Sequence, residues 1–313
     1  MVAFISYGNL VRAWTKLKVN PKNLTGKTVL ITGGNEGIGF ETALQLAKMN
    51  AKIIIASRNL SRSEQAVAKI KQLSHNSDIY CFQLDLGSIQ SVNEFIEKFK
   101  QEFPVLDILI NNSGISPVSY SKSKDGMESC VQVNHLSPFL LTLKLVELLE
   151  KAEMPRIVNL SSRGHEFATL SLPGDLHTAK EAYKSFPVYC KTKLMNILFT
   201  KELAKRLAPK NISVVAVHPG FVNTNIGVSS IPSPIVRFFV NILLSFFRFL
   251  FARNTHEGAK TTVFAAIDDS VKTGEYYDSC KPAEVSEQGK DSNLASSLWT
   301  YSANLMGIDP NFV

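Results

Sequence analysis

The chain has 313 residues, of which 45% are hydrophobic and 19% charged, and it carries a formal net charge of +7. This composition can bury enough apolar surface to offset the entropy lost on folding, which excludes a disordered chain. The four cysteines, Cys81, Cys130, Cys190 and Cys280, form no CxxC pair, so a disulfide framework or a zinc site is disfavoured and an intracellular, reducing compartment is expected. The basic residues form no run of five, so the charge does not indicate a nucleic-acid partner.

Residues 1–26 form an apolar stretch, which includes Phe4, Leu10 and Trp14, followed by a basic flank. A signal peptide has its positive charges before the apolar part, and the run here is too short and interrupted to span a bilayer. We interpret residues 1–26 as an amphipathic segment that precedes one domain, residues 27–313. A terminal helix packed on that domain explains the pattern equally well.

From Lys27 onward, short β-branched runs alternate with longer segments of helical period. This alternation is typical of an α/β, doubly wound (Rossmann) fold, in which helices cover both faces of a parallel sheet. Seven parallel strands are predicted, at residues 28–32, 52–56, 79–84, 106–110, 156–160, 212–217 and 275–277. Capping-box spacings predict helix starts at Ser61 with Glu64 and at Ser91 with Glu94.

A glycine-rich turn follows the first predicted strand and leads into a helical pattern. Glycines at 33, 37 and 39 let such a turn reverse tightly, approach a pyrophosphate and pack its helix on the sheet. The helix N-terminus then faces the anion. The turn therefore predicts a dinucleotide site.

The end of the second predicted strand indicates which dinucleotide binds. A site selective for NAD usually has a carboxylate there, whereas this chain has Ser57 and Arg58. A guanidinium can pair with a 2′-phosphate, so NADP(H) is favoured over NAD(H). Glu36, inside the turn, argues against this unless its side chain points to solvent.

Several short motifs occur in the order in which one known family has them. They are Thr32-Gly33 with Gly37 and Gly39, Asp85, Asn111-Asn112-Ser113-Gly114, Asn134, Ser162, Tyr189 with Lys193, and Pro219-Gly220 with Thr224. The chain resembles the short-chain dehydrogenase/reductase family over nearly all of residues 27–313, with Ser113 where that family has Ala. Looser matches around Tyr189 and near the C-terminus resemble its retinol dehydrogenase-like branch.

The spacing of Tyr189 and Lys193 places both side chains on one helix face. An ammonium beside a phenol favours the phenolate, so we expect Lys193 to lower the pKa of Tyr189 toward that of a working general acid/base. Ser162 would stabilise the charge that develops on the substrate oxygen. The resemblance implies that Asn134 supports a proton-relay water and that Lys193 also holds the nicotinamide ribose.

The predicted catalytic set is therefore Asn134, Ser162, Tyr189 and Lys193. The predicted cofactor-binding residues, most of them from the resemblance, are Thr32, Gly33, Asn35, Gly37, Ile38, Gly39, Ser57, Arg58, Asp85, Leu86, Asn111, Asn112, Gly114, Tyr189, Lys193, Pro219, Gly220 and Thr224. No metal site is predicted, because no His pair has metal-ligand spacing. His135, His165, His177 and His218 are expected to be structural.

Two further segments concern the substrate. Residues 170–186 are an insertion that we interpret as a loop near the substrate. In residues 235–252, the polar side chains Arg237, Asn241, Ser245 and Arg248 fall within an arc of about 80° on a helix, and the rest is apolar. A substrate channel, a bilayer interface, a protein partner or an ordinary core or dimer helix each accommodates such a segment.

We predict an NADP-dependent oxidoreductase that interconverts an alcohol and a carbonyl on a retinoid-, steroid- or lipid-like substrate. Two possibilities are left open: that the protein lies peripherally on the cytoplasmic face of an internal membrane, and that it forms a homo-oligomer. The alternatives are a non-catalytic NADP(H)-binding scaffold or redox sensor, and a membrane-tethering module.

Overall fold

The structure is a computed structural model that describes residues 16–220 and 254–312. One sheet runs through its centre, with strand order β3-β2-β1-β4-β5-β6-β7-β8. The strands are β1 (Thr28–Thr32), β2 (Lys52–Ser57), β3 (Ile79–Gln83), β4 (Ile108–Asn111), β5 (Arg156–Leu160), β6 (Ser213–His218), β7 (Tyr276–Asp278) and β8 (Lys281–Pro282). The first seven are parallel to their neighbours, so their carboxyl ends share one edge.

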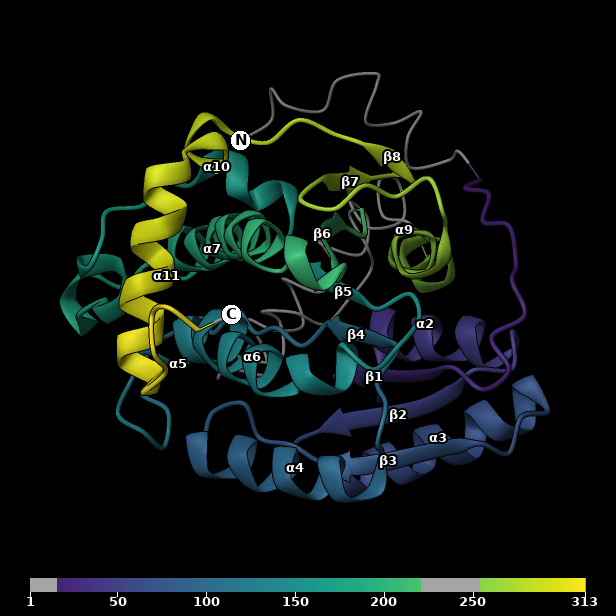
Figure 1. The fold of residues 1–313 in the computed structure, drawn as a ribbon. Coiled ribbons are helices and arrows are strands. Elements are labelled where there is room, and N and C mark those ends of the chain that lie inside the picture. Colours follow the sequence, from purple (N-terminus) through teal and green to yellow (C-terminus); the bar gives the residue numbers. More distant parts are fainter. Residues whose placement is uncertain (1–15, 221–253, 313) are drawn as a thin grey trace.

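Helices cover both faces of the sheet (Figure 1). The longer ones are α2 (Gly37–Ala47), α3 (Leu60–Ser74), α4 (Ile89–Glu102), α6 (Ser137–Leu149), α7 (Ser185–Arg206), α9 (Thr255–Ile267) and α11 (Ser292–Met306). The short ones are α5 (Ser129–Val131), α10 (Glu287–Lys290), the π-helix η1 (Gln132–Leu136) and the 3₁₀ turns η2 (Arg163–Phe167), η3 (Gly174–His177), η4 (Lys180–Ala182) and η5 (Ala208–Lys210). The predicted α/β, doubly wound single domain is confirmed.

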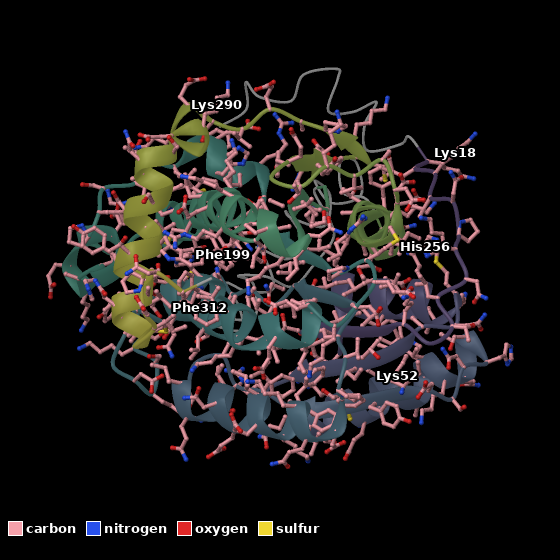
Figure 2. All side chains as sticks on the ribbon, in the orientation of Figure 1. Lys18, Lys52, Phe199, His256, Lys290 and Phe312 are labelled. Atoms are coloured by element: carbon pink, nitrogen blue, oxygen red, sulfur yellow. The ribbon has the colours of Figure 1, made fainter. Side chains whose placement is uncertain are left out.

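Alternate residues of each strand face the two helical layers. Leu30 of β1 packs with α4, α6 and α7, whereas its neighbours Val29 and Ile31 pack with α2, α3 and α9. Phe199 of α7 stacks on Trp299 of α11 with ring centroids 6.2 Å apart. Figure 2 shows Phe199 in the interior and lysines such as Lys18 and Lys290 at the periphery.

The seven predicted strands are confirmed with ends that shift by one or two residues, but a purely parallel sheet was wrong. β8 pairs antiparallel with β7 through a two-residue turn, Ser279-Cys280. Both turn residues have positive φ, at 55° and 59°, the conformation of a type I′ hairpin. Asn-Gly or Asp-Gly usually marks that turn, and Ser-Cys gives no such signal.

The predicted capping boxes were also wrong in their first residue. Asn59 caps α3 by accepting a hydrogen bond from the Arg62 backbone N–H, and Ser88 caps α4 by accepting one from Ser91. Asn59 lies two residues before the predicted start at Ser61, and Ser88 lies three residues before the predicted start at Ser91. In each case the side-chain oxygen of the cap accepts from the backbone N–H three residues later.

Residues 16–26 run alongside α9 without forming a helix. The Leu17 backbone N–H donates to Glu257 Oε2 at 3.0 Å, and its carbonyl accepts from Lys260 Nζ at 2.9 Å. The rest of the predicted N-terminal segment, Thr224 and the apolar residues 235–252 lie outside the described residues. Within the described ranges, no helix has both the length and the hydropathy that crossing a bilayer requires.

Candidate active site

The glycine turn between β1 and α2 is packed so tightly that side chains would not fit. A β-carbon at Gly39 would lie 2.3 Å from the Gly33 carbonyl oxygen and 2.5 Å from Asn112 Nδ2. One at Gly33, where φ is +67°, would lie 2.7 Å from Ser113 Oγ. Bare backbone therefore lines this turn at the N-terminus of α2, a cradle that fits a pyrophosphate.

Hydrogen bonds hold the end of β4 against this turn. Thr32 Oγ1 accepts from the backbone N–H groups of Asn112 and Ser113, at 3.0 and 3.1 Å. Asn112 Nδ2 in turn donates to the carbonyls of Thr32 and Gly33, at 2.8 and 3.1 Å. These four bonds fix the turn against β4.

Asn111 and Asn112 have different surroundings, although the family motif treats them together. The Asn111 side chain is buried and donates to Thr142 Oγ1 at 2.9 Å and to Asn159 Oδ1 at 2.8 Å. Its amide thus ties β4 to α6 and β5. The Nδ2 of Asn111 is engaged inside the fold, whereas its buried Oδ1 has no hydrogen-bond partner among the described residues.

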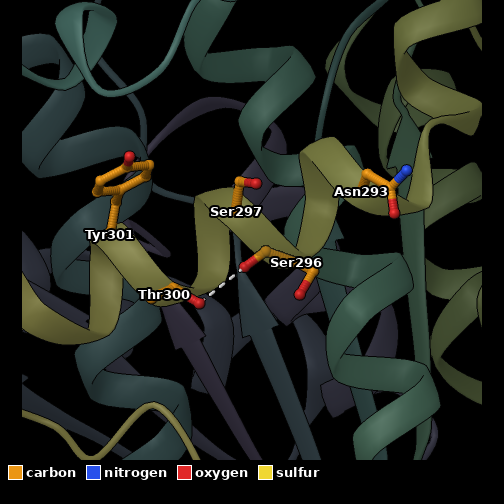
Figure 3. A pocket seen from close by; sticks show the side chains of 5 residues that line it. All are labelled: Asn293, Ser296, Ser297, Thr300 and Tyr301. Atoms are coloured by element: carbon orange, nitrogen blue, oxygen red, sulfur yellow. Dashed lines mark hydrogen bonds between the residues drawn. The ribbon is translucent and has the colours of Figure 1, made fainter.

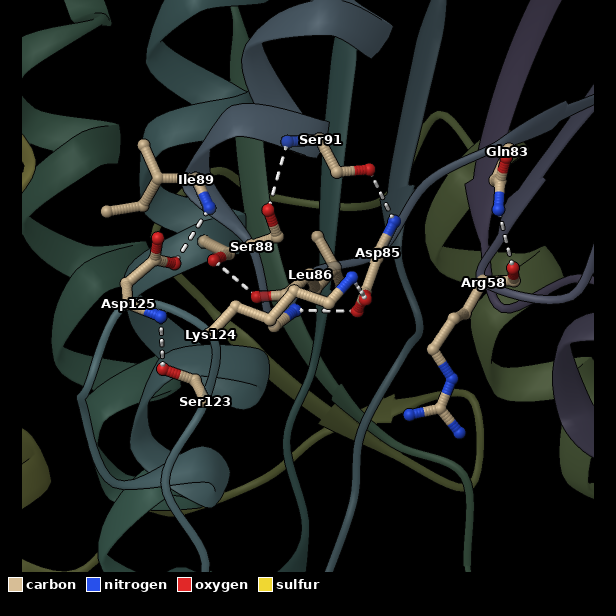
Figure 4. Close-up of polar contacts among 12 residues, drawn as sticks. Arg58, Gln83, Asp85, Leu86, Ser88, Ile89, Ser91, Ser123, Lys124 and Asp125 are labelled. Carbon is tan, nitrogen blue, oxygen red and sulfur yellow. Dashed lines mark hydrogen bonds and ion pairs between the residues drawn. The ribbon is translucent and has the colours of Figure 1, made fainter.

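At the end of β2, the side chains of Ser57 and Arg58 also have different surroundings. The Ser57 hydroxyl is buried and lies 2.6 Å from Ser63 Oγ, at the start of α3, whereas Arg58 is exposed. Figure 4 shows the Arg58 side chain extended along the same edge as Asp85. Glu36 is exposed, so its charge is directed to solvent.

Asp85 lies among cations after β3. Its Oδ2 is 2.9 Å from Lys124 Nζ and its Oδ1 accepts from the Gly87 N–H at 3.0 Å (Figure 4). Burial opposes ionisation, but the bonds from Lys124 and Gly87 and the charge of Arg58 hold the pKa of Asp85 below its ordinary value. Leu86, which follows, is buried and its carbonyl accepts from Ser137 Oγ at 2.6 Å.

The predicted catalytic side chains meet at the carboxyl edge of β5. Ser162 follows that strand, and Tyr189 comes from the first turns of α7. A β-carbon on Gly164 would lie 3.5 Å from Ser162 Oγ and 3.7 Å from Tyr189 Cε1, so both side chains adjoin the same turn. Lys193, one turn further, has its Nζ 5.5 Å from the centre of the Tyr189 ring and donates to the Leu160 carbonyl at 3.0 Å. A β-carbon on Gly114 would lie 3.4 Å from Lys193 Nζ, so the β4 loop closes one side.

The prediction that Lys193 lowers the pKa of Tyr189 was wrong among the groups of the chain itself. Burial raises the pKa of Tyr189 to about 12, and the bond with Ser162 only partly offsets it. Burial also lowers the pKa of Lys193 to about 8. Desolvation dominates both shifts, and the Lys193 ammonium is directed at a backbone carbonyl, not at the phenol oxygen. Tyr189 is therefore a protonated phenol at neutral pH, the form that donates a proton.

Asn134 lies in η1, a π-helical turn between α5 and α6. Its Oδ1 accepts from the Ile115 N–H at 2.7 Å, and its Nδ2 donates to the Ile115 carbonyl at 2.9 Å and to Thr192 Oγ1 at 3.0 Å. Thr192 precedes Lys193, so Asn134 joins the β4 loop to α7. π-helical turns are frequent at functional sites.

The remaining predicted residues border the same edge. Asn35 and Ile38 are half-buried in the glycine turn, and Gly220, with φ +89°, follows Pro219 beyond β6. The predicted substrate loop contains η3 and η4, and Tyr183 in it donates to the Pro117 carbonyl at 2.6 Å. Thr224 lies outside the described residues.

Sequence reasoning missed two residues next to Ser162. Gly164 and His165 form the first turn of η2, and both bond to Ser162. A lone glycine and a buried histidine after a strand carry no local signal. Only the preceding serine pointed to this turn.

Two features elsewhere do not contribute to this site. A shallow hollow on α11 is lined by Asn293, Ser296, Ser297, Thr300 and Tyr301 (Figure 3). It lies on a helix without any of the predicted site residues. In the part of the chain that the structure describes, no three His, Cys, Asp or Glu side chains are grouped to hold a metal ion.

Comparisons with known proteins agree with this geometry. Residues 27–233 match a family model described as short chain dehydrogenase. The chain is 37% identical to retinol dehydrogenase 11 of Mus musculus and 38% identical to retinol dehydrogenase 12 of Homo sapiens, each over 91% of this chain and 88% of the relative. The crystal structure of an uncharacterized protein from Mycobacterium Paratuberculosis superposes with a TM-score of 0.75 at 29% identity, covering 94% of this chain and 97% of that one.

Proposed function

Because the chain belongs to the short-chain dehydrogenase family, an oxidoreductase family that uses NAD or NADP, we propose that it interconverts a retinoid-like aldehyde and alcohol with NADP(H). The observation that carries the proposal is the meeting of Ser162, Tyr189 and Lys193 at the edge that also carries the glycine turn. A hydroxyl pair beside a dinucleotide cradle is the arrangement that carbonyl reduction requires.

The chain's own residues suit this dinucleotide. The bare turn at Gly33, Gly37 and Gly39 accommodates the pyrophosphate, and Arg58 and Asp85 stand where the adenosine would lie. Gly114, Lys193, Pro219, Gly220 and Thr224 are proposed for the nicotinamide end. When bound, the nicotinamide supplies or accepts the hydride.

Tyr189 Oη donates its proton to the carbonyl oxygen in the reduction, because burial keeps the phenol protonated. Ser162 Oγ donates a hydrogen bond to the same oxygen and stabilises its developing charge. Lys193 adds a positive charge from beneath the Tyr189 ring. In the oxidation, which starts from the deprotonated phenol, the same proton moves from the alcohol back to Tyr189.

An apolar rim supports a lipophilic substrate. Phe186 stands one turn before Tyr189 on the same helix face and is 58% exposed. It contacts Phe167 of η2, with ring centroids 6.2 Å apart. The curated relatives are named as retinol dehydrogenases, and retinol has a long apolar chain beside its alcohol.

Arg58 is expected to select the phosphorylated cofactor. Arg58→Glu should weaken NADPH binding by about 10- to 100-fold, since a charge-assisted hydrogen bond contributes about 1.5–3 kcal/mol and 1.4 kcal/mol is tenfold. NADH binding should stay within about threefold, because it has no 2′-phosphate. Titrations with each nucleotide measure both constants.

Arg62→Glu is the matched control, because Arg62 is an exposed arginine one turn further along α3. It changes the net charge equally and should leave NADPH binding nearly unchanged. Equal NADPH affinities for Arg58→Glu and wild type would contradict the assignment of Arg58.

We also propose that the protein works at a membrane surface, on the cytoplasmic face of an internal membrane. The proposal is supported by the sequence of residues 235–252, with four polar side chains on one arc, and by the apolar N-terminal segment. In vesicle flotation, the wild-type chain should bind anionic vesicles, and Phe246→Ser with Phe247→Ser should weaken binding about tenfold or more. The control Phe312→Ser should bind as wild type; equal binding of all three would contradict the proposal.

The direct test of the function measures NADPH consumption with retinal and with short aliphatic aldehydes. We expect turnover of retinal and much slower turnover of the short aldehydes, because they leave the apolar rim unfilled. NADPH binding without turnover of any aldehyde would instead support a non-catalytic scaffold.

A further inference from the structure

The turn after β5 holds Ser162 by both its side chain and its backbone. Ser162 is extended, with φ −162° and ψ 155°, and caps η2. Its Oγ accepts from the Gly164 backbone N–H at 3.1 Å. That N–H occupies one acceptor site of the oxygen and so fixes where the hydroxyl lies, in the turn that adjoins the Tyr189 ring.

His165 holds the backbone of the same serine. The Ser162 carbonyl lies 2.7 Å from His165 Nδ1 and accepts from the His165 N–H at 3.1 Å. A carbonyl can only accept, so Nδ1 carries the proton and Nε2 does not. Burial lowers the pKa of His165, which keeps the ring neutral.

The His165 ring is itself fixed by the sheet. It is fully buried and packs edge-on against the Tyr276 ring of β7, with centroids 5.1 Å apart. The turn also lies directly against the catalytic helix: a β-carbon at Gly164 would be 3.3 Å from Cys190 Sγ and 3.7 Å from Tyr189 Cε1. The sheet, the His165 ring, Ser162 and Tyr189 therefore form one packed sequence of contacts.

We propose that His165 is a positioning residue, which fixes the Ser162 hydroxyl beside the Tyr189 hydroxyl through the bond from Nδ1 to the Ser162 carbonyl. The proposal rests on the proposed function. His165 does not exchange protons with the substrate, because Nδ1 is bonded to backbone and Nε2 is buried without a hydrogen-bond partner among residues 16–220 and 254–312. It acts only through Ser162.

Two substitutions separate positioning from mere packing. His165→Leu keeps an apolar, similarly sized side chain but removes the donor. His165→Asn is smaller but retains an amide N–H close to the position of Nδ1. If packing alone matters, Leu is the milder change; if the hydrogen bond matters, Asn is.

The measurements are kcat and KM for retinal, together with NADPH affinity. For His165→Leu, kcat is expected to fall by about 10- to 100-fold, since displacements of about 1 Å in an active site cost up to that much. KM and NADPH affinity are expected to change by less than about threefold. His165→Asn is expected to recover most of the lost kcat.

Either of two results would overturn the proposal while leaving the proposed function intact. The first is a wild-type kcat in His165→Leu. The second is a kcat of His165→Asn that is as low as that of His165→Leu, or lower. If His165→Leu fails to fold, His165→Asn decides, because it keeps an N–H close to the position of Nδ1. Its kcat is expected to stay within about threefold of wild type, and a loss of about tenfold or more would overturn the proposal. A wild-type chain without turnover, by contrast, overturns the function itself and the positioning role with it.

Discussion

Tyr189→Phe is expected to lower the rate of retinal reduction by about 10²- to 10⁴-fold, the usual contribution of a positioned general acid. The substitution removes only the Oη of the phenol, and the ring beside Lys193 stays. NADPH affinity should therefore change little. Steady-state rates and a fluorescence titration of NADPH separate the two effects.

Tyr183→Phe is the matched control. Tyr183 is another half-buried tyrosine near the site, whose hydroxyl donates to the Pro117 carbonyl. Losing that bond should lower the rate by less than about tenfold. Similar rates for wild type and Tyr189→Phe would remove Tyr189 from the mechanism.

The pH dependence of the reduction has a defined sign. Tyr189 stays protonated up to a pKa of about 12, so its titration does not limit the rate near neutral pH. Lys193, with a pKa lowered by burial to about 8, loses its charge as the pH rises above that value. The reduction rate is therefore expected to fall above about pH 8 and to level off below it.

Gly39→Ala is expected to weaken NADPH binding by about 100-fold and to destabilise the fold. The added carbon would lie 2.3 Å from the Gly33 carbonyl oxygen and 2.5 Å from Asn112 Nδ2. Neither atom can move without disturbing hydrogen bonds, because Asn112 Nδ2 donates to the backbone carbonyls of Thr32 and Gly33. Overpacking of this kind costs about 1–3 kcal/mol, which calorimetry and thermal unfolding would detect.

Gly174→Ala provides the control, since a β-carbon at Gly174 would have no atom within 4 Å. It should leave both the melting temperature and NADPH affinity near their wild-type values. If Gly39→Ala binds NADPH as tightly as Gly174→Ala does, the glycine turn is not the cradle for the pyrophosphate.

The fold was predictable from the regular alternation of short buried strands with longer helical segments along the sequence. β1 and β5 are buried along their whole length, and each has an apolar, mostly β-branched centre, Val-Leu-Ile in β1 and Ile-Val in β5, that can be found in the sequence. β8 was not predictable, because it has two residues and a turn without Asn or Gly. Helix starts were misplaced because Ser61 and Ser91 offer capping spacings as good as the ones that Asn59 and Ser88 use.

The site was predictable as a set of positions but not in its orientations. The order of motifs located Ser162, Tyr189 and Lys193, yet it could not show that Asn111 and Ser57 direct their side chains into the helical layers. Nor could spacing alone show that burial raises the pKa of Tyr189 and lowers the pKa of Lys193. Desolvation depends on everything packed around a group, which no local pattern contains.

Hydride transfer at this site is tested most directly by isotope transfer. NADPH carrying two deuterium atoms at the reactive nicotinamide carbon is incubated with retinal and either the wild-type chain or Tyr189→Phe, and the product is followed by mass spectrometry. The account predicts retinol with one deuterium on its alcohol carbon, formed about 10²- to 10⁴-fold more slowly by Tyr189→Phe. Retinol without deuterium, or equal rates of labelling by both chains, would contradict it.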